Sequence, residues 1–177
     1  MTKILISVGL ATLLCGGAFA ATSGTVVKED RIQREVRHEL VTLSRYGVFD
    51  NISYRVDGTE VTLMGQVVEP VLKDDAASAV KGIEGVTRVN NQIEVLPVSP
   101  MDWGIRRAVY RAIYGDPGLS RYAFQAVPSI HIIVKNGHVT LEGAVANQMD
   151  SSLANIRANS VPGVFSVDNH LRLDTQL

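Results

Sequence analysis

The stretch Val134-Lys135-Asn136-Gly137-His138-Val139-Thr140-Leu141-Glu142-Gly143-Ala144-Val145 decides the fold of this chain. Apolar and polar residues alternate on both sides of Asn136-Gly137, a dipeptide that favours the tight turn of a β-hairpin. The stretch therefore predicts two paired strands with one buried face. The same pattern runs earlier from Val56 to Val67, where Asp57-Gly58 takes the turn and Val-Thr-Leu-x-Gly-x-Val is repeated.

The two stretches belong to a longer duplication, because matched positions stay 78 residues apart beyond the hairpin. Between residues 52–95 and 130–173, twelve of forty-four ungapped positions are identical. Most identities are apolar residues or glycines, so the repeat defines architecture more firmly than chemistry. We expect the shared glycines to serve turns and close packing, and the shared asparagines to bond the backbone at turns. These structural positions are Gly65, Gly85, Asn91, Gly143, Gly163 and Asn169.

Hydrophobic spacing predicts the other elements of each module. In the first module, apolar residues at helical spacing indicate a helix over 29–43, a second helix starts at Pro70 and ends near Lys81, and a third strand spans 86–95. In the second module, Asp102 is the expected N-cap of a helix that Gly115 to Gly118 ends. Its second helix is marked by Met149, Leu153 and Ile156, and its third strand spans 164–173.

The order helix, strand, strand, helix, strand occurs twice. We therefore predict an α+β fold of two tandem αββαβ modules, each a small mixed three-stranded sheet with two helices on one face. The expected segments are a signal peptide over 1–20, a polar leader over 21–28 with little structure, a first module over 29–96, a proline-containing linker over 97–101 and a second module over 102–174. Modules of about 70 residues are near the lower size limit for one core, so we expect a compact pair.

The first twenty residues are typical of a secretory signal. Lys3 precedes an apolar run over 4–14, and an Ala-x-Ala ending at Ala20 suits cleavage there. Lipidation at Cys15 is disfavoured because that processing needs a small preceding residue and Leu14 is large. We expect a periplasmic protein without this anchor; the alternative is a retained anchor helix over 4–14.

The exported chain has few residue patterns that are typical of catalytic or metal-binding sites. Without residues 1–20 it keeps no cysteine and its formal net charge becomes −2, which excludes thiol catalysis and argues against bulk nucleic-acid binding. The four histidines show no metal-ligand spacing, and Asp74-Asp75 suits a helix N-terminal charge better than an acid–base pair. We therefore expect no enzyme activity, no metal and no cofactor.

The repeated motifs resemble those of the BON-domain family. The resemblance rests on the quoted hairpin followed by Val161-Pro162-Gly163-Val164-Phe165-Ser166-Val167-Asp168-Asn169, and on Ile83-Glu84-Gly85-Val86-Thr87-Arg88-Val89-Asn90-Asn91 in the first module. It covers nearly all of the exported chain and implies an αββαβ fold, a bacterial envelope setting, and a non-enzymatic role in phospholipid attachment or osmotic and envelope stress protection. The family motif supplies no catalytic set. Some two-module members are outer-membrane lipoproteins, from which the Leu14-Cys15 pair departs.

One helix carries a pattern beyond packing. If Ile105, Val109 and Ile113 face the core, arginines and aromatic residues share the exposed side and its flanks, a combination that suits the headgroup level of an anionic bilayer. The candidate lipid-binding residues are Trp103, Arg106, Arg107, Tyr110, Arg111 and Tyr114. A solvated helix face is the simpler alternative. A second candidate, formed by Arg31, Arg34 and Arg37, lacks aromatic residues and ranks lower.

Two functions follow as hypotheses. The first is peripheral association with anionic phospholipid membranes in support of the envelope under osmotic or other stress. The second is a protein-interaction module in which an exposed sheet face or an edge strand docks an envelope partner. Lipid binding would weaken with salt and with charge reversal at Arg107 and Arg111, whereas strand docking would not.

Overall fold

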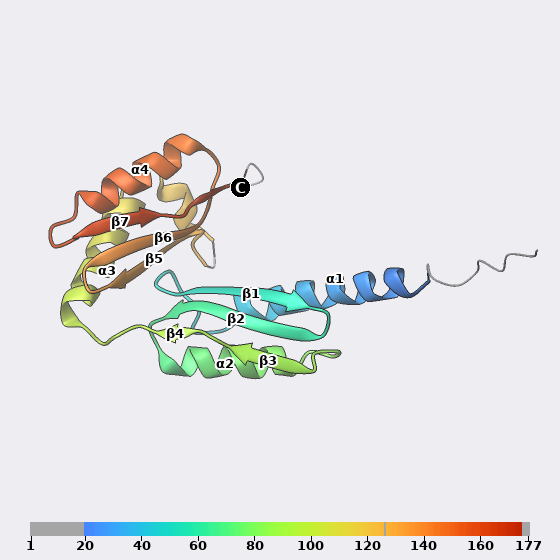
Figure 1. Cartoon of the computed structure of the whole chain (residues 1–177). Helices are drawn as coiled ribbons and strands as arrows, with labels where there is room; N and C mark the ends of the chain where they lie inside the picture. The colour runs from blue at the N-terminus through green and yellow to red at the C-terminus, as the bar shows by residue number, and fades with distance from the viewer. Residues whose placement is uncertain (1–19, 126, 175–177) are drawn as a thin grey trace, which may run out of the picture.

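A computed structural model describes residues 20–125 and 127–174, with side chains from Glu29 onward (Figure 1). The predicted signal segment up to residue 19, including Cys15, lies outside the described residues. The first module comprises α1 (Ala20–Val41), β1 (Asn51–Asp57), β2 (Glu60–Val67), α2 (Pro70–Lys81), β3 (Arg88–Asn91) and β4 (Glu94–Val95). The second comprises α3 (Pro100–Tyr114), the 3-10 helix η1 (Ser120–Ala123), β5 (Ile130–Lys135), β6 (His138–Val145), α4 (Gln148–Asn159), β7 (Ser166–Asn169) and β8 (Arg172–Leu173).

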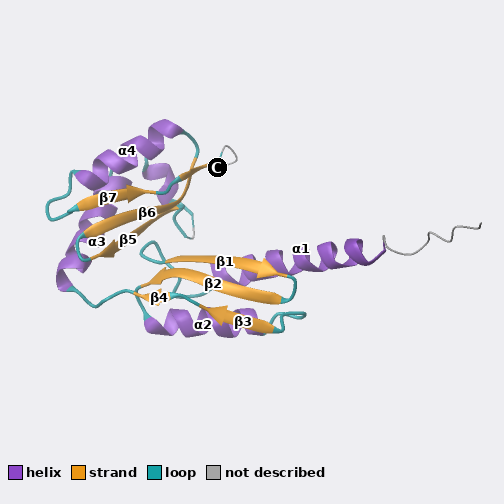
Figure 2. Ribbon diagram, viewed as in Figure 1, coloured by secondary structure: helices purple, strands orange, loops and turns teal. Residues whose placement is uncertain are grey.

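Both modules have the same mixed sheet, as the duplication predicts. β2 lies at the centre, antiparallel to β1 on one side and parallel to β3 and β4 on the other. β6 pairs in the same way with β5, β7 and β8. The two helices of each module contact each other and their sheet, and each module has its own hydrophobic core (Figure 2). The predicted α+β fold is confirmed.

The predicted third strand is broken in both modules, and an asparagine bonds the backbone at the break. Asn91 donates from Nδ2 to the Lys73 carbonyl at 2.8 Å and accepts from the Ile93 N–H at 3.2 Å. Asn169 likewise donates to the Ser151 carbonyl at 3.0 Å and accepts from the Leu171 N–H at 3.2 Å. The backbone-bonding role predicted for these asparagines is confirmed, and each also fastens a helix to its sheet.

The glycine of Val-Thr-Leu-x-Gly is required by close approach of the neighbouring strand. A Cβ at Gly143 would lie 2.0 Å from the Ser129 carbonyl oxygen, and Gly143 has a φ of 115°. Gly65 repeats the arrangement against Asn51, at 2.1 Å and φ 113°. Any side chain there would force the hairpin strands apart.

The two hairpin turns fall at equivalent positions of the repeat, although the sequence predicts one of them a residue too early. Asn136 and Gly137 have φ values of 53° and 80° and form the two-residue loop that the sequence predicts. In the first module Asp57 pairs with Glu60 and ends β1, so the loop residues are Gly58 and Thr59 rather than the predicted Asp57 and Gly58. The prediction that Asp57-Gly58 takes the turn is therefore wrong, because the positive φ that the turn needs falls on Gly58 as its first loop residue.

Three helix predictions need correction. α1 begins at Ala20, so the segment 21–28 is helical rather than a leader with little structure. Ser99, whose Oγ accepts from the Asp102 N–H at 3.2 Å, is the N-cap of α3 in place of Asp102. α4 exists and contacts α3, but Met149 and Ile156 are exposed and its buried residues are the small or polar Asp150, Ser151, Ala154 and Ala158.

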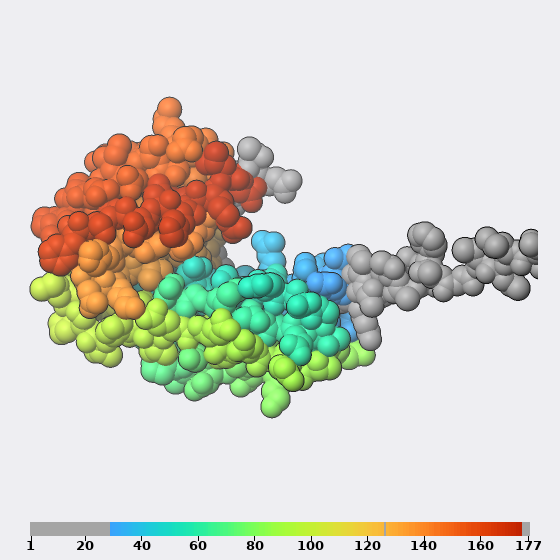
Figure 3. All heavy atoms as spheres, viewed as in Figure 1, coloured from blue at the N-terminus to red at the C-terminus, as the bar shows by residue number. Residues whose placement is uncertain are grey.

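The two modules pack directly against each other, which confirms the expected compact pair (Figure 3). The contact is made by the loop that connects α1 to β1. Val48 and Phe49 of this loop pack against the core of the second module, and the Val48 carbonyl accepts from the Ile132 N–H at 2.8 Å. Lys135 and Glu94 form an ion pair across the modules at 2.6 Å.

Candidate functional site

The helix α3 positions the candidate lipid-binding residues. Ile105, Val109 and Ile113 are buried in the second core, as the apolar spacing predicts, and α3 packs on β5. Arg107 and Arg111 are exposed on the opposite side, one turn apart. Both guanidinium groups can therefore meet a ligand surface from the same face of the helix.

The aromatic residues Trp103 and Tyr110 are only partly exposed, at 42% and 36%. Both rings contact Phe49 of the first module edge-on, at 5.6 Å and 6.2 Å between ring centroids. Phe49 therefore holds these side chains in place and leaves part of each ring accessible. The first module thus contributes to the shape of a surface that the sequence assigns to the second alone.

The expectation that Arg106 and Tyr114 lie on or beside the exposed face is wrong, because both are buried, at 2% and 8% exposure. Tyr114 donates its hydroxyl proton to the Ile130 carbonyl at 2.5 Å, and burial raises the pKa of its phenol. Arg106 donates from Nη2 to the Val134 carbonyl at 2.7 Å. Both side chains bond the backbone of β5 and are unavailable to a flat membrane surface.

Asp102 joins the start of α3 to the β5–β6 turn. Its carboxylate is buried and accepts from the N–H groups of Asn136 at 2.9 Å and Gly137 at 2.8 Å. The Gly137 carbonyl in turn accepts from the Phe165 N–H at 2.9 Å, in the loop before β7. The start of α3, the turn and this loop consequently lie at one end of the second module (Figure 1).

That end exposes apolar side chains that sequence reasoning did not select. Met101 is 67% exposed, Phe165 is 72% exposed, and Val98 in the connector is fully exposed. We call Val98, Met101, Trp103 and Phe165 the apolar end. Met101 and Val98 belong to the segment predicted as a proline-containing linker. Two large apolar residues in such a linker could have indicated an exposed apolar surface. The exposure of Phe165 could not be predicted in this way, because Phe165 lies within the repeated Gly-Val motif, whose apolar residues are expected to be buried.

The lower-ranked arginine set on α1 is partly engaged. Arg31 contacts Glu35 at 3.1 Å and Glu84 at 3.6 Å, and it donates to the Glu84 carbonyl. Arg34 and Arg37 are exposed on the same helix. This surface carries two accessible cations without an aromatic neighbour, so it remains the weaker candidate.

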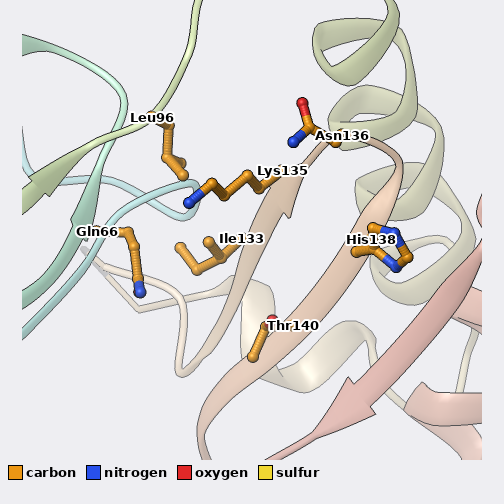
Figure 4. Close-up of a pocket in the computed structure, with 7 residues that line it drawn as sticks. All are labelled: Gln66, Leu96, Ile133, Lys135, Asn136, His138 and Thr140. Carbon is orange, nitrogen blue, oxygen red and sulfur yellow. The ribbon is translucent and has the colours of Figure 1, made fainter.

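A cleft of about 240 Å³ lies between the modules over the outer face of the second sheet (Figure 4). Gln66 and Leu96 face Ile133, Lys135 and Thr140 across it. Its one lysine, Lys135, already forms an ion pair with Glu94. Its histidine, His138, also has a partner, because its Nδ1 lies 2.8 Å from Ser166 Oγ. This cleft is best explained as part of the contact between modules.

A second cavity of about 350 Å³ lies where the connector passes from one module to the other. Its walls are mainly apolar and come from Val68, the segment 96–100 and Trp103, and Arg106 also lines it. Nε of Arg106 is buried without a hydrogen-bond partner among the described residues. The cavity therefore combines an apolar lining with one incompletely bonded cation.

The accessibility of the sheet edges bears on the hypothesis that a partner strand docks on this protein. On the outer face of β5, His131 and Ile133 are buried. At the edge of β5, the Ile132 N–H donates to the Val48 carbonyl. The chain itself therefore occupies part of the β5 edge of this sheet. In the first module the corresponding residues Ser53 and Arg55 of β1 are exposed. β1 is therefore an edge strand with an exposed outer face, while β3 with β4 and β7 with β8 form the opposite edges of the two sheets.

Within the described ranges, no three His, Cys, Asp or Glu side chains are grouped so as to hold a metal ion. Nor does any helix in those ranges have the length and apolar composition needed to cross a bilayer. The acidic side chains with unusual surroundings have structural partners: Asp116, whose pKa is lowered by the Gly118 N–H and by Arg157, is one of them.

Comparison with known proteins adds to this geometry. The BON domain family matches residues 28–97 and 103–175, one match in each module. The chain belongs to the BON-domain family. It is similar to the osmotically-inducible protein Y of Escherichia coli, with 30% identity over 157 residues that cover 84% of this chain and 74% of that protein.

The chain is also similar to the outer membrane lipoprotein DolP of Haemophilus influenzae, with 27% identity over 89% of this chain and 84% of that protein. The C-terminal domain of the type III secretion protein CdsD of Chlamydia trachomatis aligns over 80% of this chain and 96% of its own, at 11% identity and a TM-score of 0.28. That likeness is too low to bear on function. The alignments with the first two relatives each cover more than four fifths of this BON-domain chain and so extend into both of its modules.

Proposed function

We propose that this BON-domain protein is a non-enzymatic protein of the bacterial envelope that associates peripherally with anionic phospholipid membranes and supports the envelope under osmotic or other stress. The observation that carries the proposal is the exposed row of Trp103, Arg107 and Arg111 on α3, beginning at the apolar end. The names of the two relatives, one osmotically inducible and one an outer membrane lipoprotein, support the envelope setting.

The geometry gives a mode of contact. The apolar end can enter the headgroup layer, since Val98, Met101 and Phe165 present apolar surface that a soluble partner-free state leaves in water. Arg107 lies four residues beyond Trp103, about 6 Å along the helix, and is then at the level of the lipid phosphates. Each arginine near such a surface contributes about 1 kcal/mol, so the attachment is weak and sensitive to salt.

The test is co-sedimentation of the exported, purified protein with vesicles of neutral phosphatidylcholine and with vesicles that also contain phosphatidylglycerol. Binding only to the anionic vesicles, weaker at physiological than at low salt, is the expected result. The Arg107→Glu/Arg111→Glu variant should bind at least roughly tenfold more weakly, because attraction is replaced by repulsion.

The matched control is Arg34→Glu/Arg37→Glu, which makes the same charge change on the exposed face of α1. It should keep most of the binding if the surface is on α3. Equal loss in both variants would mean that net charge alone governs attachment. Absence of binding to any vesicle would reject the lipid proposal and leave docking of an envelope protein on the exposed β1 edge as the function to test.

A further inference from the structure

The cavity beside the connector contains a cation whose bonding the fold leaves incomplete. Arg106 is 2% exposed, and its Nη2 donates to the Val134 carbonyl. Its Nε is buried and has no hydrogen-bond partner among the described residues. A buried guanidinium is strongly unfavourable unless its charge and its N–H groups find partners.

The nearest carboxylates do not supply that partner. Asp102 accepts from the Asn136 and Gly137 N–H groups, and Asp50 accepts from the N–H groups of Gly47 at 3.1 Å and Val68 at 2.8 Å. Neither forms a salt bridge with Arg106 in the described part of the chain. Burial lowers the pKa of Arg106, and the charges of Asp102 and Asp50 only oppose this lowering from a distance.

Apart from Arg106 and Ser99, the residues that line the cavity are apolar or aromatic. Val68, Leu96 and Pro97 form its wall, and Trp103, whose ring centroid is 6.0 Å from the Arg106 guanidinium carbon, lies beside the cation. Val98, which is fully exposed, and Trp103, which is partly exposed, connect the cavity to solvent. A volume of about 350 Å³ is at the small end of ligand sites, so it suits one chain rather than a two-chain lipid.

We propose that this cavity binds a single-chain anionic amphiphile, whose carboxylate or phosphate group is held by Arg106 and whose first methylenes pack against Val68, Leu96 and Trp103. The shared chemistry is one anionic group on one apolar chain, as in a free fatty acid or an alkyl phosphate. The site differs from the membrane-facing surface, because Arg106 is buried and Arg107 and Arg111 face the other way. The inference therefore does not depend on the proposed function.

Trp103 is the only tryptophan of the chain, so its fluorescence reports on the cavity directly. The test titrates the full exported protein with dodecanoate, dodecyl phosphate, neutral dodecyl maltoside and dodecyltrimethylammonium, all below their micelle-forming concentrations, and with inorganic phosphate. Saturable binding of both anionic amphiphiles is expected, with the neutral and cationic ones and phosphate each roughly tenfold weaker or more. Equilibrium dialysis measures the same affinities independently of the tryptophan.

Three variants locate the site. Arg106→Met should weaken anion binding roughly tenfold or more, while Arg107→Met, the neighbouring exposed arginine, should leave it unchanged. Val68→Phe fills the cavity without touching the backbone N–H that Asp50 accepts from, and it should abolish binding even if Arg106→Met fails to fold. Far-UV circular dichroism confirms that each variant is folded.

The outcome is separable from that of the vesicle experiment. Arg107→Glu/Arg111→Glu should lose vesicle binding and keep dodecanoate binding, whereas Val68→Phe should do the reverse. Dodecanoate binding that is undetectable by both methods, equal to that of the cationic amphiphile, or unchanged in Val68→Phe would overturn the proposed cavity site.

Discussion

Tyr46 of the first module stacks on His131 of the second, with ring centroids 5.4 Å apart and planes 28° from parallel. His131 is 9% exposed, its Nδ1 has no hydrogen-bond partner among the described residues, and burial lowers the pKa of its imidazole from the ordinary 6.5. The carbonyls of Asp50 and Gly47 and the charge of Glu142 oppose the lowering, and burial outweighs them. The contact between modules therefore favours a neutral histidine.

This relationship predicts a pH dependence of stability. As the pH falls below about 6.5, the unfolded chain takes up a proton at His131 that the native state resists, so the free energy of unfolding decreases; above that pH the residue has no effect. Urea unfolding between about pH 7.5 and 5.5 should show this loss, and His131→Phe, which keeps the ring stacking, should reduce it.

The control is His38→Gln, an exposed histidine on α1, which should leave the pH dependence unchanged. The range is kept above the carboxyl region because burial raises the pKa of Asp50, and its protonation at lower pH acts in the opposite direction. An identical slope for His131→Phe and the natural protein would contradict the prediction.

Phe49→Ala should loosen the two modules from each other. The change removes the edge-on contacts with Trp103 and Tyr110 and leaves a void against the second core, at a cost of about 2–3 kcal/mol for this half-buried side chain. Trp103 emission should shift to longer wavelength, and small-angle X-ray scattering should give a larger radius of gyration. Phe124→Ala, at a side chain that is 86% exposed, should change neither.

Asp102→Asn should destabilise the second module. The carboxylate accepts two backbone N–H groups while 1% exposed, and an asparagine there accepts at one oxygen and turns an N–H₂ group toward a donor. We expect a loss of about 2–3 kcal/mol in the free energy of unfolding, measured in urea. Asp168→Asn, at an exposed position of β7, should have an effect within about 0.5 kcal/mol.

Two glycine substitutions should act in opposite directions. Gly143→Ala places a Cβ 2.0 Å from the Ser129 carbonyl oxygen and should cost more than about 2 kcal/mol, since the backbone of β5 must move. Gly104→Ala, at a half-buried position of α3 where a Cβ would meet nothing within 4 Å, should stabilise the protein by about 0.5–1 kcal/mol. A thermal unfolding scan of both variants tests the pair, and destabilisation by Gly104→Ala would contradict the helical geometry assigned to it.

Local patterns in the sequence were enough for the architecture. The alternation around Asn136-Gly137, the 78-residue repeat and Pro70 at a helix start each concern residues that are neighbours along the chain or equivalents between modules. The hairpin pairing, the order of elements, the close packing at the shared glycines and the backbone bonding of Asn91 and Asn169 followed from them. Family membership also followed, because the family motif consists of these same structural residues.

Helix faces were less well predicted, and α3 shows the reason. The spacing of Ile105, Val109 and Ile113 identifies the core face, but it treats α3 as packed on its own module alone. Tyr114 and Arg106 are buried because the carbonyls of β5 and the connector between modules lie against them, and no local spacing contains those partners. In α4, likewise, the face that is buried carries small and polar residues rather than the largest apolar ones.

By itself, then, the sequence determined the two αββαβ modules, the Asn136-Gly137 turn and the exposed pair Arg107 and Arg111, since periodicity and turn chemistry act over a few residues. Only the tertiary structure decided that the loop carrying Tyr46 and Phe49 covers the second sheet and that Phe165 joins Met101 at one end. It also decided that Arg106 lies in an apolar cavity. Tyr46 and His131 are 85 positions apart in the chain, Met101 and Phe165 are 64 apart, and Val68 and Arg106 are 38 apart. Each relation depends on how whole elements pack, which the local pattern of residues does not encode.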